Sequence, residues 1–112
     1  MFVPTILALI FSAVGVTPAY AATLTVINTA DNGPGSLRNT IASASPGDTI
    51  IFDASLSGTI IYLASTLTLS KNVTIDGSAL ASKITISGDT DNNGTGDVRV
   101  FLVNTGVTAT LN

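Results

Sequence analysis

Five short segments of the chain repeat one alternation, in which a threonine stands between two apolar or small residues. They are Leu24-Thr25-Val26, Leu67-Thr68-Leu69, Val73-Thr74-Ile75, Ile84-Thr85-Ile86 and Ala109-Thr110-Leu111. Alternation with a period of two is typical of a β-strand that buries one face. Each segment is too short to bury that face alone, so the pattern predicts repeats that stack on one another in a β-solenoid.

The residues between these segments predict the other elements. A first strand is expected at 23–27, and the turn-forming run 31–35 then leads to Ser36 as the N-cap of a short helix. Pro46 and Gly47 end that helix, because proline cannot continue it and glycine releases the chain. The apolar face of the helix consists of Leu37, Ile41 and Ala44. Only strands and turns are predicted beyond it, with strands at 49–52, 59–63, 66–70, 72–76, 83–87, 99–104 and 107–111.

The fold class predicted from this pattern is mainly β, with parallel strands in a three-sided coil. Connections between the short strands vary from about one residue to more than ten, whereas hairpins favour two-residue turns between strands of matched length. An antiparallel β-sandwich is the alternative. In the coil, alternate residues face the core: Leu67, Leu69, Val73, Ile75, Ile84 and Ile86 point inward, and Thr68, Thr74 and Thr85 point outward.

The N-terminus carries the pattern of a signal peptide. An uncharged apolar run at 5–16 is followed by Ala19-Tyr20-Ala21, an A-x-A cleavage pattern that predicts a mature start at Ala22. No basic residue precedes the run, so an uncleaved anchor is the alternative. A membrane span needs about 20 apolar residues, and Pro4 and Pro18 bracket a shorter core. We therefore expect a signal peptide at 1–21 and a secreted or cell-surface product.

Composition limits the class of function. The chain has 112 residues and a net charge of −3, with 46% hydrophobic and 10% charged residues, which fits one small folded domain. Its four cations, Arg38, Lys71, Lys83 and Arg99, are scattered, so no nucleic-acid partner is expected. The chain has no Cys and no His, and all seven acids are Asp. Thiolate metal sites and the commonest general base are therefore excluded.

An ordered series of motifs resembles one family. The series runs through Asn28-Thr29-Ala30-Asp31-Asn32-Gly33-Pro34-Gly35-Ser36-Leu37-Arg38, Ile41-Ala42, Pro46-Gly47-Asp48-Thr49-Ile50-Ile51-Phe52, Leu56-Ser57-Gly58-Thr59-Ile60, Leu67-Thr68-Leu69 and Val73-Thr74-Ile75-Asp76-Gly77. It is similar to the start of bacterial surface proteins with right-handed parallel β-helix repeats, the polymorphic-outer-membrane-protein-like chains that open on a Ser-Leu-Arg cap segment. The Cys often found before Ser-Leu-Arg is replaced here by Gly35.

The resemblance implies a division of the chain and a class of function. Residues 1–21 are expected to be the signal peptide, 22–48 an N-terminal strand and helical cap, and 49–112 the first coils of a right-handed parallel β-helix, with further coils at the C-terminal edge. The implied function is a non-catalytic secreted or cell-surface module for adhesion, structure or contact with glycans or cell-surface components. The alternative is the leading segment of a carbohydrate-active β-helix enzyme, a polysaccharide lyase or hydrolase.

Candidate catalytic and binding side chains each have a plainer structural explanation, so no catalytic residue is assigned. Asp48, Asp53 and Asp76 adjoin glycines or strand ends, where aspartate usually caps a turn. Arg38 near the cap is expected to satisfy carbonyl groups or to pair with an Asp rather than to hold a ligand. The threonines Thr68, Thr74, Thr85 and Thr110 either form one flat outward array or simply suit the solvent side of strands.

The segment 89–97 is the one candidate metal site, for Ca²⁺. Its proposed ligands are Asp89, Asp91, Asn93, Thr95 and Asp97. They match loop positions 1, 3, 5, 7 and 9 of a calcium-binding loop, with Gly94 at position 6, and alternation turns successive oxygens toward one hard cation. Val100 stands where such loops carry a bidentate Glu, so an EF-hand proper is excluded. The alternative is a polar, flexible insertion between two coils.

Overall fold

The computed structural model describes residues 21–112. The predicted signal peptide therefore lies, except for Ala21, outside the described residues. The helices of residues 21–112 are all too short or too polar to cross a membrane. The elements in chain order are β1 (Thr23–Val26), α1 (Leu37–Ser43), β2 (Thr49–Phe52), the 3₁₀ helix η3 (Ala54–Leu56), β3 (Ile60–Tyr62), β4 (Leu67–Leu69), β5 (Val73–Asp76), β6 (Thr85–Ser87), β7 (Phe101–Val103) and β8 (Ala109–Leu111).

The fold is mainly β, and every strand pair within residues 21–112 is parallel. One sheet has four strands in the order β1-β2-β5-β8, and two smaller sheets join β3 to β6 and β4 to β7. Neighbouring β4 and β5 do not pair with each other, as a hairpin would require. The antiparallel sandwich is therefore contradicted, because its strands would pair with their sequence neighbours in opposite directions.

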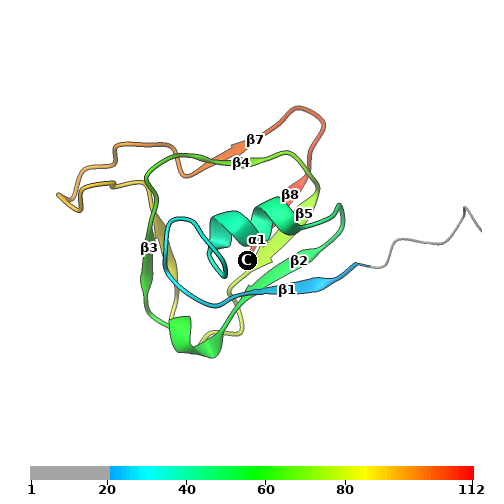
Figure 1. Cartoon of the computed structure of the whole chain (residues 1–112), viewed down its shortest axis with the longest axis horizontal. Coiled ribbons are helices and arrows are strands. Elements are labelled where there is room, and N and C mark those ends of the chain that lie inside the picture. The colour runs from blue at the N-terminus through cyan, green and yellow to red at the C-terminus, as the bar shows by residue number, and fades with distance from the viewer. Residues whose placement is uncertain (1–20) are drawn as a thin grey trace, which may run out of the picture.

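The chain visits the three sheets in a fixed order. β2 lies in the four-stranded sheet, β3 and β4 lie in the two smaller sheets, and β5, β6 and β7 repeat that order before β8 returns to the first sheet. In Figure 1 the three sheets lie on three sides of the interior, with α1 across it. The core therefore lies between the sheets.

Side chains alternate between this core and the surface as the sequence predicts. Leu67 and Leu69 of β4 are almost fully buried, and Thr68 between them is exposed. Val73 and Ile75 of β5 are buried in the same core. The predicted inward residues Ile84 and Ile86 pack against this core and remain partly exposed. Thr85 is exposed and Thr74 is half-buried, so the predicted orientation is confirmed.

The helix α1 begins as predicted at Ser36, whose side chain accepts a hydrogen bond from the backbone amide of Asn39. The chain enters the helix through Gly35, which has φ = 83° and where a Cβ would stand 2.4 Å from the Ile27 side chain. Only glycine fits this close approach. Leu37 and Ile41 of the helix are buried in the core, so α1 covers one end of it.

Ionic side chains attach α1 to the strands. The Arg38 guanidinium pairs with the Asp31 carboxylate at 3.0 Å and donates to the carbonyls of Ser65 and Thr66. Lys71 donates to the carbonyls of Ala42 and Ala44 at the other end of the helix, where a cation is favourable to the helix dipole. Arg38 thus has the structural role that the sequence predicts.

The sequence prediction is wrong in one detail and leaves a second one open. The turn at 54–56 is a 3₁₀ helix, capped by the Asp53 carboxylate, which accepts from the amide of Ser55. Of the two explanations for the four threonines, the single flat array is contradicted, because Thr68 and Thr85 lie in the smaller sheets, opposite Leu102 and Ile60. A different threonine row crosses the four-stranded sheet, in the register Thr23, Thr49, Thr74 and Thr110.

Candidate metal centre

The acidic loop connects β6 to β7 and is closed at its base by one carbonyl. The Gly88 carbonyl accepts hydrogen bonds from the amides of Asp97 and Val98, at 2.9 and 3.0 Å. A Cβ on Gly88 would stand 2.1 Å from the Val98 carbonyl oxygen, so only glycine allows the two chain segments to meet. The loop is therefore a closed excursion from the sheets.

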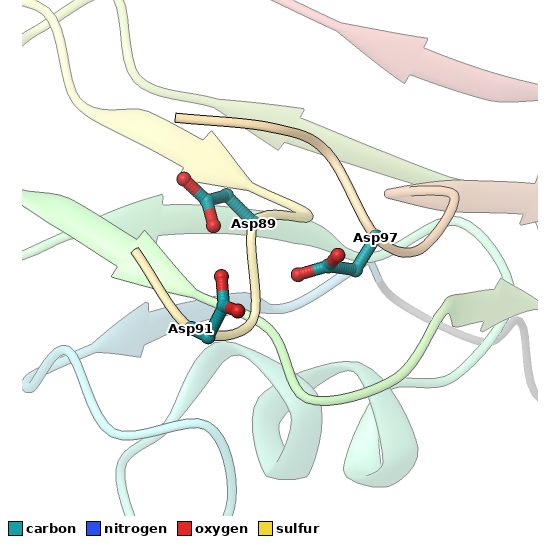
Figure 2. Close-up of side chains that lie close together, drawn as sticks. All are labelled: Asp89, Asp91 and Asp97. Atoms are coloured by element: carbon teal, nitrogen blue, oxygen red, sulfur yellow. The ribbon is translucent and has the colours of Figure 1, made fainter. Parts of the chain in front are cut away.

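Three carboxylates of this loop lie together. Figure 2 shows Asp89, Asp91 and Asp97 on the two arms of the loop, with their carboxyl groups turned toward a common space. One oxygen from each lies within 4.8 Å of the others. The single ion pair formed within residues 21–112 joins Arg38 to Asp31, which are both distant in sequence from the acidic loop. No salt bridge therefore neutralises this cluster.

Asp89 is the least exposed of the three. The residue is 8% exposed, and its two carboxylate oxygens accept from the amides of Gly94 and Asn93, at 2.7 and 3.0 Å. Burial raises the pKa of Asp89, but these amide hydrogen bonds outweigh burial and hold the pKa below its ordinary 3.8. The carboxylate is thus ionised at neutral pH.

The other two predicted ligands shape the loop through hydrogen bonds. The Asn93 side chain donates to Asp91 Oδ2 at 2.9 Å, and its Oδ1 accepts from the amide of Thr95 at 2.8 Å. The Asp97 carboxylate accepts from both the amide and the hydroxyl of Thr90, at 2.9 and 2.8 Å. The loop brings three of the five predicted ligands together as carboxylates, and Asn93 and Thr95 brace the turn between them.

The chemistry of this cluster suits a hard divalent cation. Carboxylate oxygens are the preferred ligands of Ca²⁺. The oxygens of Asp89 each accept one amide hydrogen bond and retain a second lone pair, and the two bonds from Thr90 to Asp97 both go to Oδ2. Gathering three like charges costs free energy that a bound cation would offset. The ligands available at this cluster are oxygens, because the chain contains no His and no Cys.

The three other candidate acids cap turns, as the sequence predicts. Asp48 accepts from the amides of Ala22 and Ser45, both at 2.8 Å. Asp53 accepts from Ser55, and Asp76 accepts from the amide of Ser78. These hydrogen bonds hold the pKa of all three carboxyl groups below the ordinary value.

One contact of Asp48 is absent from the sequence prediction. Its partner Ala22 lies 26 residues earlier, and only the register of β1 on β2 brings the two together. The A-x-A pattern singles out Ala22, and the Pro-Gly-Asp turn singles out Asp48, but no local signal connects them.

Comparisons with protein-family models, with curated proteins and with solved structures give no significant match for this chain. Function is therefore inferred from the order of the strands and from the side chains they carry.

Proposed function

We propose that residues 22–112 form the capped start of a right-handed parallel β-helix, and that the protein is a non-catalytic secreted or cell-surface module. The observation that carries this proposal is the strand order, in which β2, β3 and β4 are followed by β5, β6 and β7 on the same three sheets. A chain that returns to each sheet in parallel must coil around a common axis. Such crossovers between parallel strands are right-handed in about 98% of cases.

The spacing of contacts between successive turns supports a coil with one variable corner. Contacts between Ser57 and Ser82, on neighbouring turns, join residues 25 positions apart. Asn72 and Thr108, at the corner before β5 and β8, are in contact at a separation of 36 positions, because the acidic loop lies between them in the chain. Corners of a solenoid tolerate such insertions, since each turn of the chain contacts only its neighbours.

The end of the stack supports further coils as the partner. β6, β7 and β8 each pair along one edge only within the described chain. A hollow of about 120 Å³ beside them is lined by apolar side chains that include Ile84, Phe101 and Leu111. Unpaired edges and apolar side chains at one end of a solenoid fit another coil of the same kind.

The non-catalytic role is supported by the state of the acidic side chains. The turn-capping contacts of Asp48, Asp53 and Asp76 commit their carboxylates to local structure rather than to a cleft. Adhesion, spacing or contact with glycans is the role that we propose for the module. The A-x-A pattern at Ala19–Ala21 supports export with cleavage before Ala22.

The acidic loop is proposed as a structural Ca²⁺ site of this module. The three gathered carboxylates support it. An affinity of about 10⁻⁴–10⁻³ M is expected, the range of extracellular modules. In this role the ion would order the corner between β6 and β7 rather than take part in a reaction.

The module is tested by expressing the full chain in a bacterium and assaying the purified product. We expect it in the periplasmic or secreted fraction, with no release of reducing ends or unsaturated sugars from polygalacturonate or xylan. Turnover that Asp76→Ala abolishes and the control Asp31→Ala preserves would support the carbohydrate-active alternative instead. A product that remains wholly cytoplasmic would contradict export.

A further inference from the structure

The buried carboxylate of Asp48 lies beside Ala22, where the predicted mature chain begins. Asp48 stands at the start of β2, is 4% exposed and directs Oδ1 at the backbone nitrogen of Ala22, 2.8 Å away. Its other oxygen accepts from the amide of Ser45 at 2.8 Å. Both partners are uncharged peptide groups, so the charge of this buried carboxylate is not paired within hydrogen-bond distance.

The nitrogen of Ala22 is fixed from both sides. The Ala22 carbonyl accepts from the amide of Thr49 at 2.9 Å, and the next residue, Thr23, aligns with Thr49 in the β1–β2 register. These contacts place the nitrogen at Asp48. Ala21 and Ala22 are themselves exposed, so the peptide bond that joins them is open to a protease.

Cleavage at this bond would change the charge facing Asp48. Hydrolysis adds one water molecule, whose hydroxyl goes to the Ala21 carbonyl carbon and whose hydrogen goes to the Ala22 nitrogen. The resulting α-amine has an ordinary pKa of about 7.7–8.0 and takes a further proton from solvent at neutral pH. A charge-assisted hydrogen bond between ammonium and carboxylate is about twice as strong as the neutral one that it replaces.

We propose that removal of the leader creates an α-ammonium group at Ala22 that forms an ion pair with the buried side chain of Asp48 and holds β1 on β2. The inference rests on the proposed export and cleavage. It adds a consequence for the fold, because the processed chain is held at its first strand by an ion pair that the precursor cannot make.

The nearest competing cation does not take the place of this amine. Lys71 acts on Asp48 through its charge, but its ammonium group donates to the carbonyls of Ala42 and Ala44 at the end of α1. Asp48 is also the only ionisable side chain among the buried residues at this end of the described chain, since the other buried acid, Asp89, lies in the acidic loop. The α-amine is therefore the natural partner of Asp48.

The test follows the α-amine itself in the processed protein. The full chain is expressed with its leader in a bacterium, and N-terminal sequencing of the exported product should give Ala22-Thr23-Leu24. Acetic anhydride reacts only with unprotonated amines, so the pH dependence of its reaction with Ala22, followed by mass spectrometry of the N-terminal peptide, reports the pKa. We expect a pKa about one unit or more above the ordinary 7.7–8.0.

Two variants separate the ion pair from general effects of charge. In Asp48→Asn the pKa of the α-amine should return to about 7.7–8.0, and in the control Asp53→Asn, which removes an exposed turn-capping carboxylate, it should stay raised. If Asp48→Asn does not fold, the value in the unsubstituted protein decides. An ordinary pKa there, or a raised pKa that survives Asp48→Asn, overturns the ion pair, whereas an exported product that begins elsewhere overturns the processing step.

Discussion

Aspartate side chains cap several turns of this chain by accepting hydrogen bonds from backbone amides. Asp48, Asp53 and Asp76 each accept backbone amides beside a strand or a 3₁₀ turn, and Asp89 does the same inside the acidic loop. This use explains why the chain contains seven Asp and no Glu. The shorter side chain reaches the amides two or three residues away, which a Glu would overshoot.

These caps predict that stability falls in acid. Hydrogen bonds from Ala22 and Ser45 lower the pKa of Asp48, and local hydrogen bonds lower those of Asp53 and Asp76, relative to 3.8 in the unfolded chain. The unfolded state then binds protons first, so stability is fully present above about pH 5 and is lost as the pH falls through the lowered folded values. Urea unfolding at about pH 7 and about pH 3 should show a lower midpoint in acid.

The control for that prediction is Asp53→Asn, which removes one titrating cap. Its loss of stability between the two pH values should be smaller than that of the unsubstituted chain. Equal midpoints in both conditions would mean that the capping bonds add nothing to the charged form.

A second residue-scale prediction concerns the core. Leu67 is 2% exposed, and Leu67→Ala should reduce the free energy of unfolding by about 2–5 kcal/mol, through lost burial and the cavity that remains. The control is Leu102→Ala on the neighbouring strand, where the side chain is 40% exposed, and a change within about 0.5 kcal/mol is expected. Similar losses in both variants would contradict the inward and outward assignment.

At the scale of elements, the sequence predicts the strands better than their ends. All eight strands of residues 21–112 lie within predicted segments, but most are a residue or two shorter, because Gly, Ser and Asn at the corners turn before the alternation stops. The 3₁₀ helix at 54–56 was missed since its signal is a single capping Asp followed by a few small residues. The threonine row across the four-stranded sheet was not predicted, because register depends on the lengths of distant connections, which alternation does not encode.

The acidic loop shows the same limit. Alternation correctly brings Asp89, Asp91 and Asp97 together, because side chains at every second position of a tight loop turn to one side. The bracing roles of Asn93 and Thr95 depend on the left-handed conformations of Asn92 and Gly94, with φ = 59° and 89°. That backbone path is visible only in the folded loop.

Calcium should stabilise this element. At about 10 mM Ca²⁺, a dissociation constant of about 10⁻⁴–10⁻³ M corresponds to about 1.4–2.7 kcal/mol of added stability. Thermal unfolding of the full chain should shift upward with Ca²⁺ and not with Mg²⁺, which requires a tighter octahedral shell. Asp89→Ala combined with Asp91→Ala should abolish the shift, and Asp53→Ala, outside the loop, should retain it. If Ca²⁺ does not shift the unfolding temperature, the loop is a polar corner and not a calcium site.

At the scale of the whole molecule, stability comes from stacking. Each strand of the smaller sheets has a single partner, and α1 closes one end of the core with Leu37 and Ile41. The other end presents unpaired strand edges, so this chain should associate with itself or with further coils. In the processed chain, the proposed ion pair between the α-amine of Ala22 and Asp48 would add a further contact between β1 and β2.

The central claim is that strands distant in sequence are parallel neighbours, and paired cysteines test it most directly because the native chain has none. Ile60 and Thr85 are both exposed and lie opposite each other on β3 and β6. Under mild oxidation, Ile60→Cys with Thr85→Cys should form a disulfide readily in the folded chain, and the same oxidation of the denatured chain should give much less of it. Thr68→Cys with Thr74→Cys, on β4 and β5, would be neighbours in a hairpin and should remain reduced. Rapid oxidation of the second pair and none of the first would contradict the coil.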